Sequence, residues 1–350
     1  MLLRAGRRRP VGGDALSAVG ESSARRFRRY AWGLVVYNLG VVLWGAFVRA
    51  TGSGAGCGNH WPLCNGEVLP RPESVETLIE LTHRLTSGLD GLLVAALVVW
   101  AFRAFPRRDP VRLAAVGSLV FLVSEALIGA GLVRFELVAG NASAARAWVM
   151  AAHLANTFLL LAFLTLTAEW ARREAGARRA LRLSASDPAA WLLAAGLAGS
   201  LALGVSGAVA ALGDTLFPAA SFEEGVAQEL AAGAHAFVRL RVFHPAIAFG
   251  LGLYLAVAAF AVARLRPAPA VQRRASALVW LFVVQLAVGL ANLWLAAPVG
   301  MQLVHLLLAD LVWIALVLLA AAALTPTAAM SHTRRGGQRT VLTSIPSGHG

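Results

Sequence analysis

The chain has 350 residues, of which 58% are hydrophobic and only 14% are charged, and its mean hydropathy is +0.67. A soluble domain of this length needs far more charge to cover its surface, so the composition excludes a soluble protein and favours an integral membrane protein. The net charge of +13 does not indicate nucleic-acid binding, because the arginines occur in short runs between apolar stretches, as in the loops of membrane proteins.

Continuous apolar runs predict the membrane spans. A helix needs about 20 predominantly apolar residues to cross about 30 Å of hydrocarbon, and eight runs reach that length. In lipid such runs satisfy their backbone hydrogen bonds as helices, so no sheet is expected. The predicted fold class is all-α integral membrane, with eight transmembrane helices over residues 31–49, 82–102, 112–133, 147–170, 190–211, 242–264, 275–296 and 301–323.

The distribution of arginine predicts the orientation. Eight spans place both termini on the same side, and 24 of the 31 arginines lie in the tails and loops of that side. The positive-inside rule makes this side cytoplasmic, which predicts a multi-pass protein of the inner (cytoplasmic) membrane with both termini in the cytoplasm. Residues 1–30 are polar and lack the apolar core of a signal peptide, so they are predicted to be a disordered cytoplasmic tail.

Matching short segments predict an internal repeat. Four pairs occur in the same order at offsets between 152 and 162 positions, and they are Gly45–Val48 with Gly207–Ala210, His83 with His244, Glu125 and Gly129 with Gln285 and Gly289, and His153 with His305. Each half holds an even number of spans, so both halves run the same way, and we expect two tandem, pseudo-symmetric four-helix bundles. The predicted organisation is a tail (1–30), a first bundle (31–170), a cytoplasmic linker (171–189), a second bundle (190–324) and a cytoplasmic tail (325–350).

Four histidines predict metal-ligand positions. His83, His153, His244 and His305 lie in the first turns of the second, fourth, sixth and eighth spans, which all enter from the outer side. An imidazole inside an apolar helix is costly unless it has a partner. Two imidazoles that face each other across a four-helix bundle suit a porphyrin iron with two axial ligands, whereas zinc needs further ligands close by. The pattern therefore predicts one haem in each bundle.

The two predicted sites differ in charge. Glu80 precedes His83 by three positions and lies on the same helical face, whereas Leu240 and Arg241 precede His244. A carboxylate beside only one macrocycle indicates one reactive site and one electron-transfer or structural site. The alternative for Glu80 is a solvated acid that the helix dipole favours.

Four further charged residues each have two interpretations. Glu125 and Asp310 are intramembrane acids, which act either as proton relays or as hydrogen-bonded packing groups. Arg49 and Arg84 lie at the outer interface, where a guanidinium binds haem propionates or extends its charged end into the interface.

The first outer loop contains the two cysteines of the chain, Cys57 and Cys64. The outer side is oxidising, so a disulfide is expected. It would either pin the loop or take a redox role beside the reactive site. A metal-binding loop that includes His60 is the weakest interpretation, because two cysteines and one histidine are few ligands.

With these motifs the chain resembles the haem A synthases, which act in cytochrome oxidase assembly. The resemblance extends from about Trp32 to Leu324. Its most specific segments are residues 45–54 (GAFVRATGSG), 61–66 (WPLCNG), 80–84 (ELTHR) and 213–218 (GDTLFP), together with the helix that contains His305.

The resemblance implies oxidation of the C8 methyl group of haem O to a formyl group, which gives haem A. It implies that His244 and His305 hold a haem b cofactor, that His83 and His153 bracket the substrate haem, and that Glu80 is the catalytic glutamate. Further expected partners are membrane lipid, an electron acceptor, and a haem O synthase (protohaem farnesyltransferase) that acts upstream. The sequence identifies neither the electron acceptor nor the source of the oxygen atom.

Two features depart from the family pattern, and two other functions compete. A branch of the family has a second cysteine pair that this chain lacks between Leu212 and Arg239, and the family often has glutamine at the position of Glu125.

The first alternative function is a dihaem b-type membrane electron-transfer protein that handles quinol. The second is a haem carrier that does no chemistry on the porphyrin.

Overall fold

The computed structural model describes residues 11–172, 181 and 184–325. Within these residues the structure is helical without β-strands, and eight helical segments are long and apolar enough to cross a membrane. The predicted all-α membrane class is therefore confirmed. The long helices are α1 (Val11–Ala50), α2 (Val75–Ala104), α3 (Pro110–Arg134), α4 (Ala144–Ala171), α5 (Pro188–Leu216), α8 (Phe243–Leu265), α9 (Pro269–Trp294) and α10 (Val299–Leu324).

Three short elements lie between the long helices. They are the 3₁₀ helix η1 (Ser53–Ala55), α6 (Phe222–Leu230) and α7 (Ala236–Arg241). The sixth crossing consists of α7 together with α8, from Ala236 to Leu265.

Capping residues set the starts of four long helices. The side chains of Ser74, Asp109, Ser143 and Asp187 each accept a hydrogen bond from a backbone N–H in the first turn of α2, α3, α4 and α5. These bonds satisfy amides that have no partner inside the helix. Since the caps stand before the apolar cores of the spans, the helices begin two to seven positions earlier than the apolar runs predict.

The first helix corrects the predicted tail. Its described part begins at Val11, so residues 11–30, expected to be disordered, are helical. Alanine and arginine are strong helix formers and extend the apolar span backwards. Tertiary contacts hold its later turns, since Phe27 is fully buried against Trp100 and Phe105. Residues 1–10, most of the predicted linker and nearly all of the C-terminal tail lie outside the described residues.

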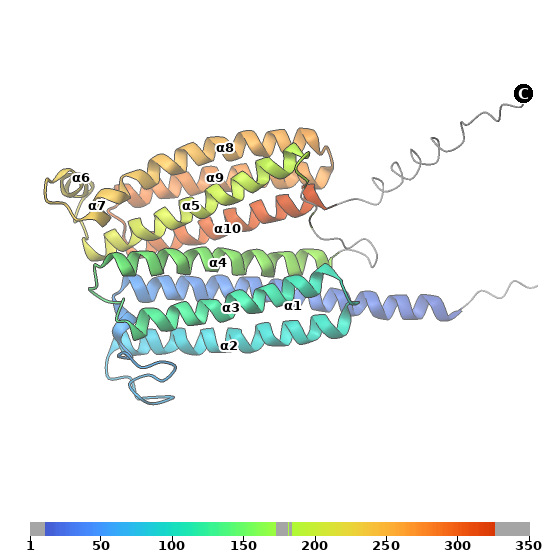
Figure 1. The fold of residues 1–350 in the computed structure, drawn as a ribbon, viewed down its shortest axis with the longest axis horizontal. Coiled ribbons are helices and arrows are strands. Elements are labelled where there is room, and N and C mark those ends of the chain that lie inside the picture. Colours follow the sequence, from blue (N-terminus) through green and yellow to red (C-terminus); the bar gives the residue numbers. More distant parts are fainter. Residues whose placement is uncertain (1–10, 173–180, 182–183, 326–350) are drawn as a thin grey trace, which may run out of the picture.

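Their contacts divide the long helices into two groups of four, which lie side by side in Figure 1. In the first group the contacts run in a closed ring from α1 through α2 and α3 to α4 and back to α1. In the second group they run from α5 through α8 and α9 to α10 and back to α5. The two four-helix groups thus match the expected bundles, while the repeat symmetry between them stays a prediction.

Helices α4 and α10 form the centre of the molecule. About 61% of the residues in the apolar window of α10 and 50% of those in α4 are buried, against 33% or less for the other crossings. The indole Nε1 of Trp313 donates a hydrogen bond of 2.6 Å to the carbonyl of Phe158, and the two rings stack with centroids 5.0 Å apart. These central contacts join the two groups into one structure.

Candidate functional site

The predicted ligands lie toward one end of the molecule, which we call the loop end. It carries the segments 51–74 and 217–235, and the described parts of both chain termini lie toward the other end (Figure 1). Helices α2, α4, α8 and α10 all start there. His83 and His153 are the ninth and tenth residues of α2 and α4, His305 is the seventh residue of α10, and His244 is the ninth residue of the crossing that α7 and α8 form. The four therefore lie at a similar distance from the loop end.

In the second group His244 and His305 face each other. Their ring centroids are 6.3 Å apart and the ring planes cross at 82°. An imidazole nitrogen binds a metal at about 2.0–2.1 Å, so two rings on opposite sides of one iron have centroids on the order of 6 Å apart. The observed separation therefore fits the two axial ligands of a haem.

The partners of these two rings differ. The hydroxyl of Ser206 lies 2.9 Å from His244 Nδ1, within hydrogen-bond distance. Gln285 Nε2 is 3.4 Å from His305 Nε2, and His305 Nδ1 is buried without a hydrogen-bond partner in the described chain. A buried polar nitrogen without a partner is costly in a finished core and is expected where a ligand completes the site.

Three of the four histidines rest against glycines of a neighbouring helix. A Cβ atom built on Gly45 would lie 2.9 Å from His83 Cε1, one on Gly207 would lie 3.0 Å from His244 Cε1, and one on Gly289 would lie 2.8 Å from His305 Cε1. These distances are shorter than ordinary carbon–carbon contacts, so only glycine leaves the rings where they are. The repeat includes all three glycines, yet their packing against the histidines is not apparent from the sequence.

In the first group His153 lies beside Glu125. The distance from His153 Nδ1 to Glu125 Oε1 is 3.3 Å, without hydrogen-bond geometry. Glu125 also accepts hydrogen bonds from the amide of Asn156 and the hydroxyl of Thr157. Glu125 is therefore part of a polar network that holds the His153 side of this site, while His83 Nδ1 is buried without a partner within the described residues.

Glu80 is buried at the start of α2, with 3% of its surface exposed. Its Oε2 accepts a hydrogen bond of 2.8 Å from the backbone N–H of Cys57, and its Oε1 accepts from the guanidinium of Arg84. The alternative of a solvated acid is therefore wrong, because the carboxylate is desolvated and both oxygens are held.

The expected disulfide between Cys57 and Cys64 is present, and both cysteines are buried. His60 is exposed, and no three His, Cys, Asp or Glu side chains among the described residues gather in a way that could hold a bare metal ion. The metal-loop interpretation therefore finds no support, and this loop belongs with Glu80. A haem needs only two protein ligands, because the porphyrin supplies the others.

Comparison with known proteins gives the family. Residues 28–317 match the cytochrome oxidase assembly protein family. The chain belongs to this family.

Relatives with curated names are of two kinds. A Thermus thermophilus protein named protoheme IX farnesyltransferase is 51% identical over 313 residues, which cover 89% of this chain and 51% of the relative. Proteins named heme A synthase from Geobacillus kaustophilus and an Exiguobacterium species are 46% and 44% identical over 109 and 96 residues, about a third of each relative. The chain thus spans about half or less of the length of these curated relatives.

In the second half of the chain, an arginine occupies the position that corresponds to Glu80 in the first half. Arg241 stands three positions before His244, as Glu80 stands before His83. Its guanidinium pairs with Asp214 at 3.1 Å and with Glu229 at 2.8 Å. The sequence shows the lack of an acid here, but the structure shows that Arg241 instead ties α6 to α5 beside the second site.

Two more of the charged residues have defined contacts. Arg49 of α1 donates hydrogen bonds to the carbonyl of Ala211, to the hydroxyl of Thr215 and to Gln302 Oε1, and so crosses from the first group to the second. Asp310 of α10 is fully buried, and neither carboxylate oxygen has a hydrogen-bond partner in the part of the chain that the structure describes. The two interpretations of Asp310 therefore both stay predictions.

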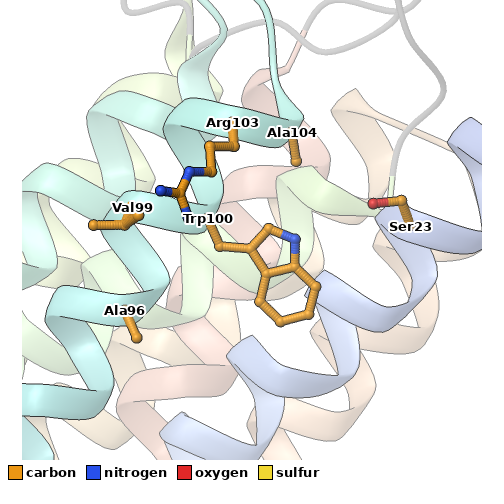
Figure 2. A pocket seen from close by; sticks show the side chains of 6 residues that line it. All are labelled: Ser23, Ala96, Val99, Trp100, Arg103 and Ala104. Atoms are coloured by element: carbon orange, nitrogen blue, oxygen red, sulfur yellow. The ribbon is translucent and has the colours of Figure 1, made fainter.

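A cavity of about 590 Å³ lies at the opposite end of the molecule, which is predicted to face the cytoplasm, between α1 and α2 (Figure 2). It is lined by Ser23 of α1 and by Trp100, Arg103 and three small apolar side chains of α2. None of the predicted site residues lines it. The cavity is therefore separate from the histidine sites.

Proposed function

We propose that the protein is a haem A synthase, which oxidises the C8 methyl group of haem O to a formyl group and so supplies haem A to cytochrome oxidase. The observation that carries this proposal is the buried carboxylate of Glu80, one turn before His83, in only one of two histidine-bearing helix groups. The family and the relatives named heme A synthase support it.

We assign a resident haem b to the second group. His244 and His305 would hold it, since the two rings face each other 6.3 Å apart and Gly207 and Gly289 leave room for both. When bound, this haem supplies one-electron redox chemistry. Ser206 fixes the orientation of the His244 ring through Nδ1, as outer partners of metal-bound histidines do.

The first group would bind the substrate. His83 and His153 bracket haem O, and Glu125 orients the His153 ring from one side. Glu80 stabilises positive charge that develops at the methyl carbon or takes a proton from attacking water. Burial removes water from the carboxylate, and the fixed donors hold it in one orientation.

The setting of the protein follows from this function. We propose that the protein lies in the inner membrane with both termini in the cytoplasm, contacts membrane lipid, and passes electrons to a separate acceptor. A haem O synthase is a reasonable partner because it makes the substrate. The similarity to a Thermus protein named protoheme IX farnesyltransferase supports a link to that step.

Two other functions explain less. A dihaem b-type electron-transfer protein would use the same histidines, but it has no need for a buried carboxylate beside one site. A farnesyltransferase acting on a diphosphate needs acidic residues that hold Mg²⁺ beside the phosphates. The described residues gather no group of three acids, histidines or cysteines for a metal ion.

The deciding experiment is haem extraction from membranes that contain this protein and a source of haem O. We expect haem A in the wild type and at least about 100-fold less in Glu80→Gln, since general acid–base groups contribute about 10²–10⁴-fold. Glu76→Gln is the matched control, because Glu76 lies one turn earlier on α2 and is exposed. Unchanged haem O beside bound haem b in a folded wild type would instead favour electron transfer.

A further inference from the structure

The disulfide loop folds directly onto the start of α2. The hydroxyl of Thr77 donates a hydrogen bond of 2.7 Å to the carbonyl of Gly56. A Cβ atom on Gly56 would lie 2.4 Å from the backbone carbon of Glu76, so only glycine permits this approach of the two backbones. The loop is thus seated one turn before Glu80.

Arg84 connects Glu80 to the same loop. Its Nε and Nη2 donate to Glu80 Oε1, while its Nη1 donates to the carbonyls of His60 at 2.7 Å and Leu63 at 2.6 Å. One planar guanidinium therefore bonds a carboxylate on its own helix and two carbonyls of the loop. Arginine offers five donors in a fixed fork, which suits this arrangement.

The disulfide joins the two parts of the loop that hold the carboxylate. Cys57 supplies the backbone N–H that donates to Glu80 Oε2, and Cys64 follows Leu63, whose carbonyl accepts from Arg84. Glu80 is therefore held from one side by the loop amide and from the other by an arginine that the loop also holds. We call the segment 56–64 together with Arg84 the clamp.

The second half provides a natural comparison. The repeat places Arg241 at the position of Glu80, and the chain has no cysteines beyond Cys57 and Cys64. In that half the arginine is held by the acids Asp214 and Glu229. A disulfide loop thus occurs only in the half that has a carboxylate at this position.

We propose that Arg84 and the disulfide-closed loop are a positioning device that fixes the carboxylate of Glu80 toward the substrate. This inference rests on the proposed function, in which Glu80 is the reacting group. It makes Arg84 a positioning residue rather than a ligand of a haem propionate. In this proposal the disulfide stabilises the loop that holds Glu80, and it passes no electrons.

A double-mutant cycle tests this role. We expect Arg84→Met to lower kcat at least tenfold while the Kd for haem O, measured by spectral titration, stays within about twofold. Adding Arg84→Met to Glu80→Gln should cause no further loss, because the two residues act as one unit. Arg84→Lys should recover part of kcat, since a lysine still donates to Glu80.

The double variant Cys57→Ala with Cys64→Ala should behave like Arg84→Met, with a lower kcat, nearly unchanged haem O binding and no further effect in the Glu80→Gln protein. Two results would overturn the proposal. Weaker haem O binding with an intact kcat would make Arg84 a propionate ligand. Losses that multiply in the Glu80→Gln background would show that the clamp acts independently of Glu80.

Hydrogen exchange of the purified full-length protein gives a readout that does not depend on turnover. We expect amides of residues 56–66 to exchange at least about tenfold faster in Arg84→Met and in Glu80→Gln, since each change removes a hydrogen bond to a charged group. Glu76→Gln should leave this exchange unchanged. Unaltered exchange in all three variants would overturn the clamp even if haem A is made. If both variants exchange faster but the wild-type protein makes no haem A, the proposed function is rejected and the clamp is only a structural contact.

Discussion

At the scale of single residues, glycines decide where the histidine rings can lie. His83, His244 and His305 each rest on a glycine of an adjacent helix, at distances that no Cβ atom would allow without a shift. Small residues at helix contacts are common in membrane proteins, where they bring backbones close together. Here they also leave space for an aromatic ligand, so the glycine belongs to the site as much as the histidine does.

Gly289→Ala should therefore lower the amount of bound haem b. The new methyl group would lie 2.8 Å from His305 Cε1, so the ring would have to leave the position in which it faces His244. We expect at least a severalfold loss of Soret absorbance per protein in purified samples. The control is Gly250→Ala on α8, where an added Cβ meets nothing within 4 Å. Full haem b content in Gly289→Ala would show that the glycine does not set the ring position.

Asp310 is the least explained residue of the membrane core. It is fully buried on α10, and its neighbour Trp313 packs against α4. A carboxylate buried without hydrogen bonds is expensive in its charged form. Its position on the central helix between the two groups makes it a candidate for the proton relay that the sequence predicts.

At the scale of elements, charge pairs attach α6 to α5 and to the end of α7. Arg241 binds Asp214 of α5 and Glu229 of α6, and it also donates to Gln228 at 3.2 Å. Helix α6 has no buried residues of its own. Its attachment therefore depends on these polar contacts more than on apolar burial.

Arg241→Gln should loosen α6 and the segment around it. Removal of the guanidinium leaves Asp214 and Glu229 without their common partner, and we expect a local loss of about 1.5–3 kcal/mol. Hydrogen exchange over residues 221–230 measures this loss directly. Arg239→Gln is the control, because Arg239 is exposed and its guanidinium donates to the backbone carbonyl of Ala232 and not to an acid of α5 or α6. Equal protection of α6 in both variants would contradict its dependence on Arg241.

The elements also show what the sequence could and could not predict. The eight spans follow from local apolar length, which is why they are all present. The start of α2 was expected at residue 82, but Ser74 caps the helix and brings Glu80 inside it. The bonds from Cys57 to Glu80 and from Arg241 to Asp214 depend on how distant segments pack. No periodicity in the chain encodes such contacts, so the histidines were predictable and their surroundings were not.

At the scale of the whole molecule, the two helix groups are joined by a central apolar contact, by the ion pair of Arg274 on α9 with Glu169 on α4, and by a polar bridge near the loop end. Helices α4 and α10 supply the apolar contact. Arg49 supplies the bridge, because its guanidinium leaves α1 and reaches acceptors on α5 and α10, up to 253 positions away in the chain. Both predicted haem sites lie toward this same end, so the bridge sets how their groups face each other.

Arg49→Gln should therefore weaken the union of the two groups more than it disturbs either one. Three acceptors lose a charged donor in a partly buried place, and we expect a loss of about 2–4 kcal/mol, since each such bond contributes about 1.5–3 kcal/mol and the terms do not add fully. Thermal unfolding in detergent should show a lower Tm than in the control Arg26→Gln, which changes an exposed arginine of the same helix. Because His244 and His305 belong to one group, haem b should still bind to folded Arg49→Gln with an unaltered spectrum. A Tm equal to that of the control would mean that the other contacts between the groups, among them those of Trp313 and Arg274, join them without Arg49. A changed haem b spectrum would mean that Arg49 acts on the second site directly.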